Sequence, residues 1–304
     1  MKKMLILVLC AAMAFGAAAQ ELTVATYNIR NANNGDAARG DGWERRCPWV
    51  CSLIEFHGFD IFGSQEVLDG QLHDMLAQLP DYGYIGVGRD DGMTKGEYSP
   101  IFYKKERFRL LDEGHFWLSE VTDRPNRGWD AALPRICTWG HFLDKKTKRR
   151  FWFFNLHMDH IGVQAREESA RLVVAKIREM CGPREFVILT GDFNVDQNNH
   201  IYTTFTTSGI LSDSYETAAK RYAPNGTFNS FSPSLKTASR IDHIFVSTSV
   251  RVHNYGVLTD TYRTETEESA GEIKSGAFPK EVSLHSYEAR TPSDHFPVVV
   301  RLEF

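Results

Sequence analysis

The sequence has 304 residues, of which 42% are hydrophobic and 24% are charged, and its formal net charge is −4 at pH 7. These values are ordinary for a globular protein, and the content of 20 Phe, 11 Tyr and 6 Trp argues against a disordered chain. The acidic balance also disfavours avid binding to long nucleic acid, which needs many cationic side chains.

The N-terminus has the pattern of a secretory signal peptide. Two lysines precede an apolar run over residues 4–15, and three alanines at 17–19 fit a cleavage site before Gln20. The apolar run is too short to span a membrane as a helix. We therefore expect residues 1–19 to be removed and residues 20–304 to form a single domain, secreted or periplasmic, with no transmembrane segment. Loss of the two lysines changes the net charge from −4 to −6.

The five cysteines give two further expectations. Cys10 is preceded by Leu9 where a lipoprotein site needs a small residue, so lipid anchoring is not expected. The other four are too few for a disulfide scaffold in a chain of this length, and buried free thiols are the favoured interpretation, although the sequence leaves disulfides open. They are Cys47, Cys51, Cys137 and Cys181.

The remaining chain alternates predicted strands and helices, which indicates an α/β fold. Strands are predicted over residues 22–29, 60–63, 84–87, 101–103, 108–118, 136–143, 151–157, 186–189, 241–247 and 296–302. Apolar residues at helical spacing predict helices over residues 43–56, 71–79 and 164–180. Residues 88–100 and 261–280 are predicted to be surface loops, and the basic run 145–150 a solvated hairpin turn.

Six short segments pass from an apolar strand to acid, amide or imidazole side chains. They are residues 26–30, 64–66, 155–160, 191–194, 240–243 and 293–295. Each segment alone has a purely structural explanation, since acidic residues are favourable at the start of a helix and Asp and Asn favour turns. Because strand ends gather at one edge of an α/β sheet, where ligand sites form, the set predicts one shared site.

The residue types at these strand ends also predict a chemistry. Carboxylate and amide oxygens are hard ligands, which suit Mg²⁺, Mn²⁺ or Ca²⁺ better than a structural zinc. With His and Asp present and no nucleophilic Ser or Cys constellation, the set predicts metal-assisted attack of water on phosphorus.

In this order, the six segments resemble the endonuclease/exonuclease/phosphatase superfamily of DNase-like metal phosphoesterases. The resemblance covers residues 22–304, and residues 128–135 further resemble an uncharacterised exported bacterial branch. It implies a four-layer α/β sandwich with two packed mixed β-sheets between helical layers. It also implies an exported, metal-dependent phosphoesterase that cleaves a phosphodiester or a phosphomonoester.

The resemblance assigns metal-binding roles to Asn28, Glu66 and Asp294, with Mg²⁺ or Mn²⁺ as the expected ion and Ca²⁺ as an alternative. One position departs from the family's abasic-site endonucleases, which carry an acid two residues after the first-strand Asn. Arg30 stands there in this sequence. This argues against a second acid-based metal site and against a role in DNA repair.

The resemblance assigns catalytic roles to five further residues. His157 and His295 are expected to contact the scissile phosphate, and Asp192 to align or deprotonate the attacking water. Asn194 is expected beside Asp192 as a phosphate or metal contact, and Asp242 to orient His295. An Asp242–His295 pair would also favour the charged imidazolium, which attracts a phosphoryl group.

Several other residues are candidates for substrate contact. Arginine can grip a second phosphate or carboxylate in a bidentate way, and an aromatic ring can stack on a base or sugar. These candidates are Arg124, Arg135, Arg166, Trp129, Asp159 and His160, of which Arg135 is favoured because it lies in the branch-like segment.

Three functional alternatives remain open. A small phosphorylated substrate is favoured over long nucleic acid, so a nuclease is the less favoured enzyme, and a monomer is expected. A catalytically silent module that binds phosphoesters would lack some of the family's catalytic residues. In this sequence only position 30 departs from the family pattern. A Ca²⁺-stabilised adhesin would need regular Ca²⁺-loop spacing, which the sequence does not contain.

Overall fold

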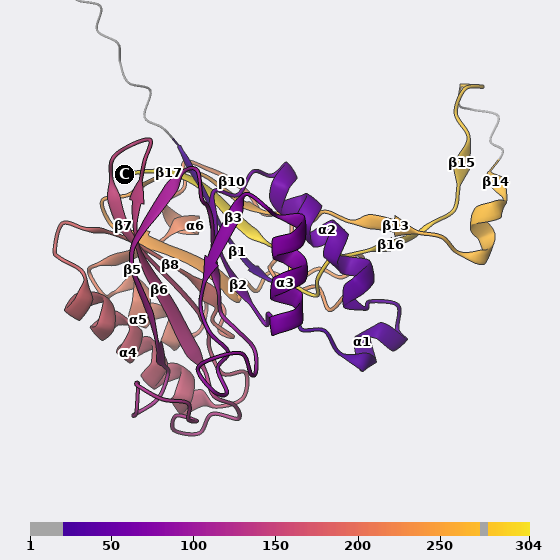
Figure 1. Ribbon diagram of the computed structural model, residues 1–304. Helices are drawn as coiled ribbons and strands as arrows, with labels where there is room; N and C mark the ends of the chain where they lie inside the picture. The colour runs from indigo at the N-terminus through magenta and orange to yellow at the C-terminus, as the bar shows by residue number, and fades with distance from the viewer. Residues whose placement is uncertain (1–20, 274–278) are drawn as a thin grey trace, which may run out of the picture.

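The computed structural model describes residues 21–273 and 279–304, so the predicted signal peptide lies outside the described residues. Two mixed β-sheets pack face to face, and helices cover the outer face of each sheet (Figure 1). This is the predicted four-layer α/β sandwich. Within the described ranges, no helix combines the length and apolarity needed to cross a membrane.

The first sheet has seven strands in the order β10-β12-β17-β1-β2-β4-β3. Its centre pairs β1 with β2 in parallel and with β17 in antiparallel orientation, so β1 is buried between two neighbours. The strands are β1 (Leu22–Asn28), β2 (Ile61–Gln65), β3 (Tyr82–Ile85), β4 (Ile101–Lys104), β10 (Lys220–Tyr222), β12 (Arg251–Val257) and β17 (Val298–Glu303).

The second sheet has six strands in the order β5-β6-β7-β8-β11-β9. A hairpin joins β6 to β7, and its turn carries the basic run, as predicted. β7 and β8 are parallel, so their polar ends reach the same edge. The strands are β5 (Phe108–Trp117), β6 (Ile136–Asp144), β7 (Arg150–His157), β8 (Phe186–Asp192), β9 (Leu211–Asp213) and β11 (Asp242–Ser247).

Apolar side chains fill three layers. One cluster, which includes Val24 and Phe153, lies between the sheets. A second joins the outer face of the first sheet to α2 (Trp43–Phe56) and α3 (Asp69–Gln78). A third joins the second sheet to α4 (Val163–Met180) and α5 (His200–Thr206). Four cysteine thiols are free, and three of them lie in or beside these clusters as buried side chains.

The predicted surface loop over residues 261–280 is wrong in part. Its described residues, 261–273 and 279–280, belong to an arm that projects from the body beyond α2 (Figure 1). β13 (Tyr262–Thr264) pairs with β16 (Glu288–Arg290), and β14 (Glu272–Ile273) pairs with β15 (Leu284–His285), with the short helix η1 (Glu267–Ala270) between them. These strands are largely exposed, so they lack the apolar alternation that marks a buried strand.

Candidate active site

The polar strand ends converge at one edge of the two sheets, as predicted. Strand pairing places Asn28 beside Gln65 in one sheet, and His157 and Asp242 each beside Asp192 in the other. A cleft of about 930 Å³ opens at this edge. Its lining includes the predicted residues Glu66, Arg135, His157, His160, Asp192, Asn194, Asp294 and His295.

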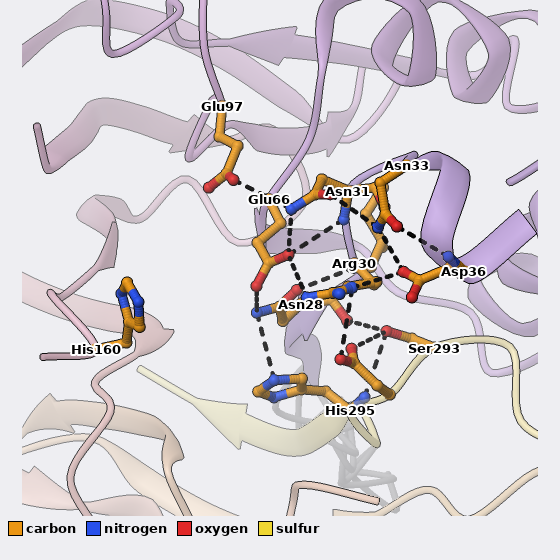
Figure 2. A network of polar contacts seen from close by, with 12 residues as sticks. Asn28, Arg30, Asn31, Asn33, Asp36, Glu66, Glu97, His160, Ser293 and His295 are labelled. Carbon is orange, nitrogen blue, oxygen red and sulfur yellow. Dashed lines mark hydrogen bonds and ion pairs between the residues drawn. The ribbon is translucent and has the colours of Figure 1, made fainter. Parts of the chain in front are cut away.

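The side-chain amide of Asn28 joins the two sheets. Its nitrogen donates to Glu66 Oε1 and to Asp192 Oδ2, each at 3.0 Å, and lies 3.5 Å from His295 Nε2 (Figure 2). Its oxygen accepts from the backbone N–H of Arg30 at 3.0 Å. In this arrangement Asn28 therefore positions the carboxylates of Glu66 and Asp192, whereas the resemblance implied a metal ligand.

His295 is held by a carboxylate. Its Nδ1 lies 2.9 Å from Asp242 Oδ2, and its Nε2 lies 3.8 Å from Asp192 Oδ2. Burial alone would lower the pKa of His295, but the charge and hydrogen bond of Asp242, together with Asp192, raise that pKa well above its usual range. The Asp242 and Asp192 carboxylates therefore favour the charged imidazolium form of His295, which also lines the cleft.

Asp192 has the properties of a proton acceptor. Burial raises its pKa to about 7; the charge of Asp242 adds to this rise, and His295 opposes it. The backbone N–H of Asn194 donates to Asp192 Oδ1 at 2.9 Å and fixes the carboxylate. A carboxylate with a pKa near neutrality is well matched to accept a proton from an attacking water.

His157 provides a neutral imidazole beside Asp192. Its Nε2 lies 3.6 Å from Asp192 Oδ2. Burial lowers the pKa of His157 well below its usual range, and the positive charges of Arg135 and Arg89 lower it further. His157 can therefore donate a hydrogen bond to a bound phosphate oxygen without adding charge.

Three carboxylates face the cleft close together: Glu66, Glu97 and Asp294. Burial raises the pKa of Glu97 and of Asp294, and the charge of Glu66 adds to both rises. Arg30 lies 3.7 Å from Glu66 and 3.7 Å from Asp294, and it offsets part of this charge. Carboxylate oxygens suit a hard divalent cation, so these three side chains are candidate ligands for one.

A second group also offers metal-ligand side chains. Asp192, Asp242 and His295 place ligand atoms within 4.8 Å of one another, so this group can also hold a metal ion. His295 Nδ1 is bonded to Asp242 Oδ2 at 2.9 Å, which leaves His295 Nε2 and the Asp192 carboxylate to contact a metal, a water or a phosphate.

Five residues that line the cleft have left-handed backbone angles, including Ser230 (φ 53°) and Phe231 (φ 59°). The other three, Arg30 (φ 59°), Glu66 (φ 60°) and Asn194 (φ 51°), each lie within two residues of the end of a strand. Such angles are costly for side chains other than Gly, and they concentrate at functional sites where the surrounding structure enforces them. In these last three residues they turn each side chain out of its strand and toward the cleft.

The loop over residues 88–100 supplies two residues that the sequence analysis missed. Arg89 and Glu97 form an ion pair of 2.7 Å that lines the cleft. The loop is anchored by isolated bridges from Tyr98 to Val67 and to Gly88. No apolar period marks this segment, so sequence alone gave no signal for a buried ion pair within it.

The candidate substrate residues separate into two groups. Arg135 and His160 line the cleft, and buried Asp159 lies behind Arg135 at 3.2 Å. Arg166 donates to the carbonyl of Asp159 at 2.9 Å. Arg166, Trp129 and Arg124 are not among the described residues that line the cleft.

A buried arginine fixes the backbone beneath the site. The guanidinium of Arg46 donates to four carbonyl oxygens, those of Ile29, Arg30, Asp41 and Pro292, at 2.7 to 3.1 Å. These bonds tie the end of β1 to the segment that carries Asp294 and His295. Arg46 therefore holds together the two chain segments that supply opposite sides of the cleft.

Replacement of Arg46 with methionine is expected to lower the free energy of unfolding by about 3–5 kcal/mol, because several buried carbonyls lose their donors. Urea denaturation would measure the change. Arg45→Met is the matched control, since Arg45 is exposed one residue earlier on the same helix. Equal stability of the two variants would contradict the structural role of Arg46.

Comparison with known proteins agrees with this arrangement. The model of the endonuclease/exonuclease/phosphatase family matches residues 25–295. The chain belongs to the endonuclease/exonuclease/phosphatase family. Among family members of known structure, the mannosyl-6-phosphatase of Bacteroides thetaiotaomicron is 56% identical, with a TM-score of 0.86, over 93% of this chain and 100% of that chain.

Two further relatives extend the comparison. A family member from Bacteroides vulgatus is 38% identical, with a TM-score of 0.79, over 94% of this chain and 99% of that chain. An uncharacterized protein of Acanthamoeba polyphaga mimivirus is 26% identical over 280 residues, which are 86% of this chain and 92% of the relative. The two matches cover 94% and 86% of this chain.

Proposed function

We propose that the protein is an exported, divalent-metal-dependent phosphatase that removes a phosphoryl group from a phosphorylated sugar. The observation that carries the proposal is the Asn28-centred junction, where Glu66, Asp192 and His295 meet within hydrogen-bonding distance of one amide. The 56% identity with a mannosyl-6-phosphatase supports a mannose phosphate as the substrate class.

In the proposed reaction, Asp192 orients the attacking water and accepts its proton. His157 and the imidazolium of His295 donate to the phosphate oxygens, and Asp242 keeps His295 charged. Glu66 and Asp294 would hold the Mg²⁺ or Mn²⁺ ion, with Ca²⁺ an alternative. When bound, this ion offsets charge on the phosphate and on the leaving oxygen.

Two features favour a small substrate over a long nucleic acid. The cleft is lined by about as many acidic as basic side chains, and its arginines are paired with carboxylates. Neutralising a polyanion needs unpaired cationic side chains along a surface.

Removal of divalent metal with EDTA is expected to abolish release of phosphate from mannose 6-phosphate, and addition of Mg²⁺ or Mn²⁺ to restore it. Phosphate release would be measured colorimetrically on the protein lacking residues 1–19. Full activity in EDTA would refute the metal dependence. Failure to cleave mannose 6-phosphate, mannosyl 6-phosphate oligosaccharides and generic phosphoesters under every metal would refute the enzyme.

Export is proposed from residues 1–19, which lie outside the described residues. Expression of the full sequence in a bacterium, followed by N-terminal sequencing of the periplasmic and secreted fractions, tests it. A mature protein that begins at Gln20 is expected. Recovery of the uncleaved chain in the cytoplasm would contradict the proposal.

A further inference from the structure

A pair of buried arginines lies beside His157, and one of them contacts Glu97 of the carboxylate set. Arg89 and Arg135 are 7% and 4% exposed, and both line the cleft. Arg89 is paired with Glu97 at 2.7 Å, and Arg135 with Asp159 at 3.2 Å. These carboxylates neutralise the charges of the two guanidinium groups. The arginines therefore contribute hydrogen-bond donors to the cleft, and little net charge.

Some nitrogens of these side chains make no hydrogen bond, although Arg89 Nε and His157 Nδ1 each lie 4.0 Å from a carboxylate oxygen, of Asp90 and of Glu97. Arg135 Nη1, Arg89 Nε and His157 Nδ1 are buried and make no hydrogen bond to any described residue. Buried guanidinium and imidazole N–H groups without a partner cost free energy, so their presence together at one wall of a cleft points to a ligand that accepts hydrogen bonds. An anionic oxygen is such an acceptor, and the planar guanidinium fork of Arg matches the geometry of a phosphate or a carboxylate.

Arg135 is also held in a fixed orientation. Its Nε donates to Asp159 Oδ2, and its Nη2 lies 2.9 Å from His160 Nδ1. Asp159 is in turn fixed by the backbone N–H groups of Ile161 and Gly162 at 3.0 and 2.8 Å. Two of the three nitrogens of Arg135 are thereby committed, and Nη1 is left for the cleft.

We propose that Arg135, with Arg89 behind it, binds the third terminal oxygen of a phosphomonoester and thereby makes the enzyme select monoesters over diesters. The inference rests on the proposed phosphatase function and names the residues that set its substrate class. A monoester has three terminal oxygens and a diester has two. The diester's second ester oxygen would leave buried Arg135 Nη1 without a strong acceptor, and sites that leave such a donor unpaired discriminate strongly.

The test compares p-nitrophenyl phosphate with bis-p-nitrophenyl phosphate on the metal-loaded protein. Loss of Arg135 alone would leave the buried Asp159 carboxylate without its ion-pair partner, so the main variant is the charge-balanced Arg135→Gln/Asp159→Asn. A second variant, Arg135→Lys, retains the positive charge but not the planar guanidinium group. We expect kcat/KM for the monoester to fall by on the order of 10²-fold in the double variant. For the diester we expect a change below about fivefold. Arg124→Gln is the matched control, since Arg124 is exposed away from the cleft.

Binding of inorganic phosphate and dimethyl phosphate, measured by calorimetry with the metal present, gives a readout independent of turnover. The original protein is expected to bind inorganic phosphate more tightly than dimethyl phosphate. The double variant is expected to bind the two with similar affinity. Equal losses for both esters, or an unchanged preference for inorganic phosphate, would overturn the inference. So would a loss seen only with a sugar bearing a second anionic group, which would place the arginines at a remote part of the substrate.

The two proposals fail in different ways. A protein that cleaves neither ester but binds inorganic phosphate through Arg135 would refute the phosphatase and retain the arginine subsite. A protein that cleaves both esters with the same ratio before and after substitution would retain the phosphatase and refute the subsite.

Discussion

Replacement of Asp192 with asparagine is expected to lower kcat by on the order of 10²–10⁴-fold while leaving the fold intact, because the side chain keeps its shape but loses the ability to accept a proton. Asparagine keeps one acceptor oxygen, which can accept from Asn194 N–H, but its NH2 group replaces the oxygen that now accepts from Asn28 Nδ2. A modest loss of stability is therefore expected beside the loss of rate. Steady-state phosphate release and thermal denaturation would be measured together.

The control for this prediction is Asp112→Asn, which makes the same chemical change at an exposed position on β5. It should match the original protein in both rate and stability. If Asp192→Asn retains more than about a tenth of the original kcat, another group must accept the proton. The neutral ring of His157, 3.6 Å from Asp192, would be the next residue to test.

Replacement of Asp242 with asparagine is expected to lower kcat/KM by on the order of 10²–10³-fold, because His295 loses the carboxylate that favours its charged form. The sign of the accompanying pH effect follows from the raised pKa of His295. An activity that needs the imidazolium is present below that pKa and is lost as the pH rises through it. Since the variant lowers this pKa, its alkaline loss of activity should begin at a lower pH.

The pH–rate profiles of Asp242→Asn and His295→Gln, taken together, would show whether the charge of His295 or only its position matters for activity. His295→Gln keeps a donor but removes the titrating ring, so its alkaline loss of activity should disappear. An unchanged alkaline limb in Asp242→Asn would contradict the coupling between Asp242 and His295. Thermal denaturation of both variants would show whether a rate loss reflects unfolding, because Asp242 is buried on β11.

The sequence was sufficient to predict the parts of the fold that bury apolar surface. Strands such as β1 and β8 and the helix α4 have strong apolar patterns, and each lies close to its predicted position. Short elements such as α6 (Ser214–Thr217) and β10 (Lys220–Tyr222) have too few residues to show any period. The arm was missed for a related reason, since its strands pair with each other and bury little.

The site could be predicted where a polar residue follows an apolar strand, which is the case for Asn28, Glu66 and Asp192. Arg89 and Glu97 could not be found this way, because they lie in a loop whose position depends on tertiary bridges. The orientation of the Asn28 amide was equally hidden. Its direction depends on which groups compete for its oxygen and nitrogen, and these groups come from segments up to 267 residues apart.

At Arg30, Glu66 and Asn194 the left-handed backbone angle costs stability, while the side chain serves the cleft. Glycine at Glu66 or Asn194 would remove the cost of the left-handed angle, but it would also remove a side-chain hydrogen bond, which Glu66 accepts from Asn28 and Asn194 donates to the carbonyl of Met158. Any glycine that a selection for heat resistance alone enriches at these positions would remove a functional group of the cleft. Thermostable versions of this enzyme must be sought in the helices and outer faces, with these three positions held fixed.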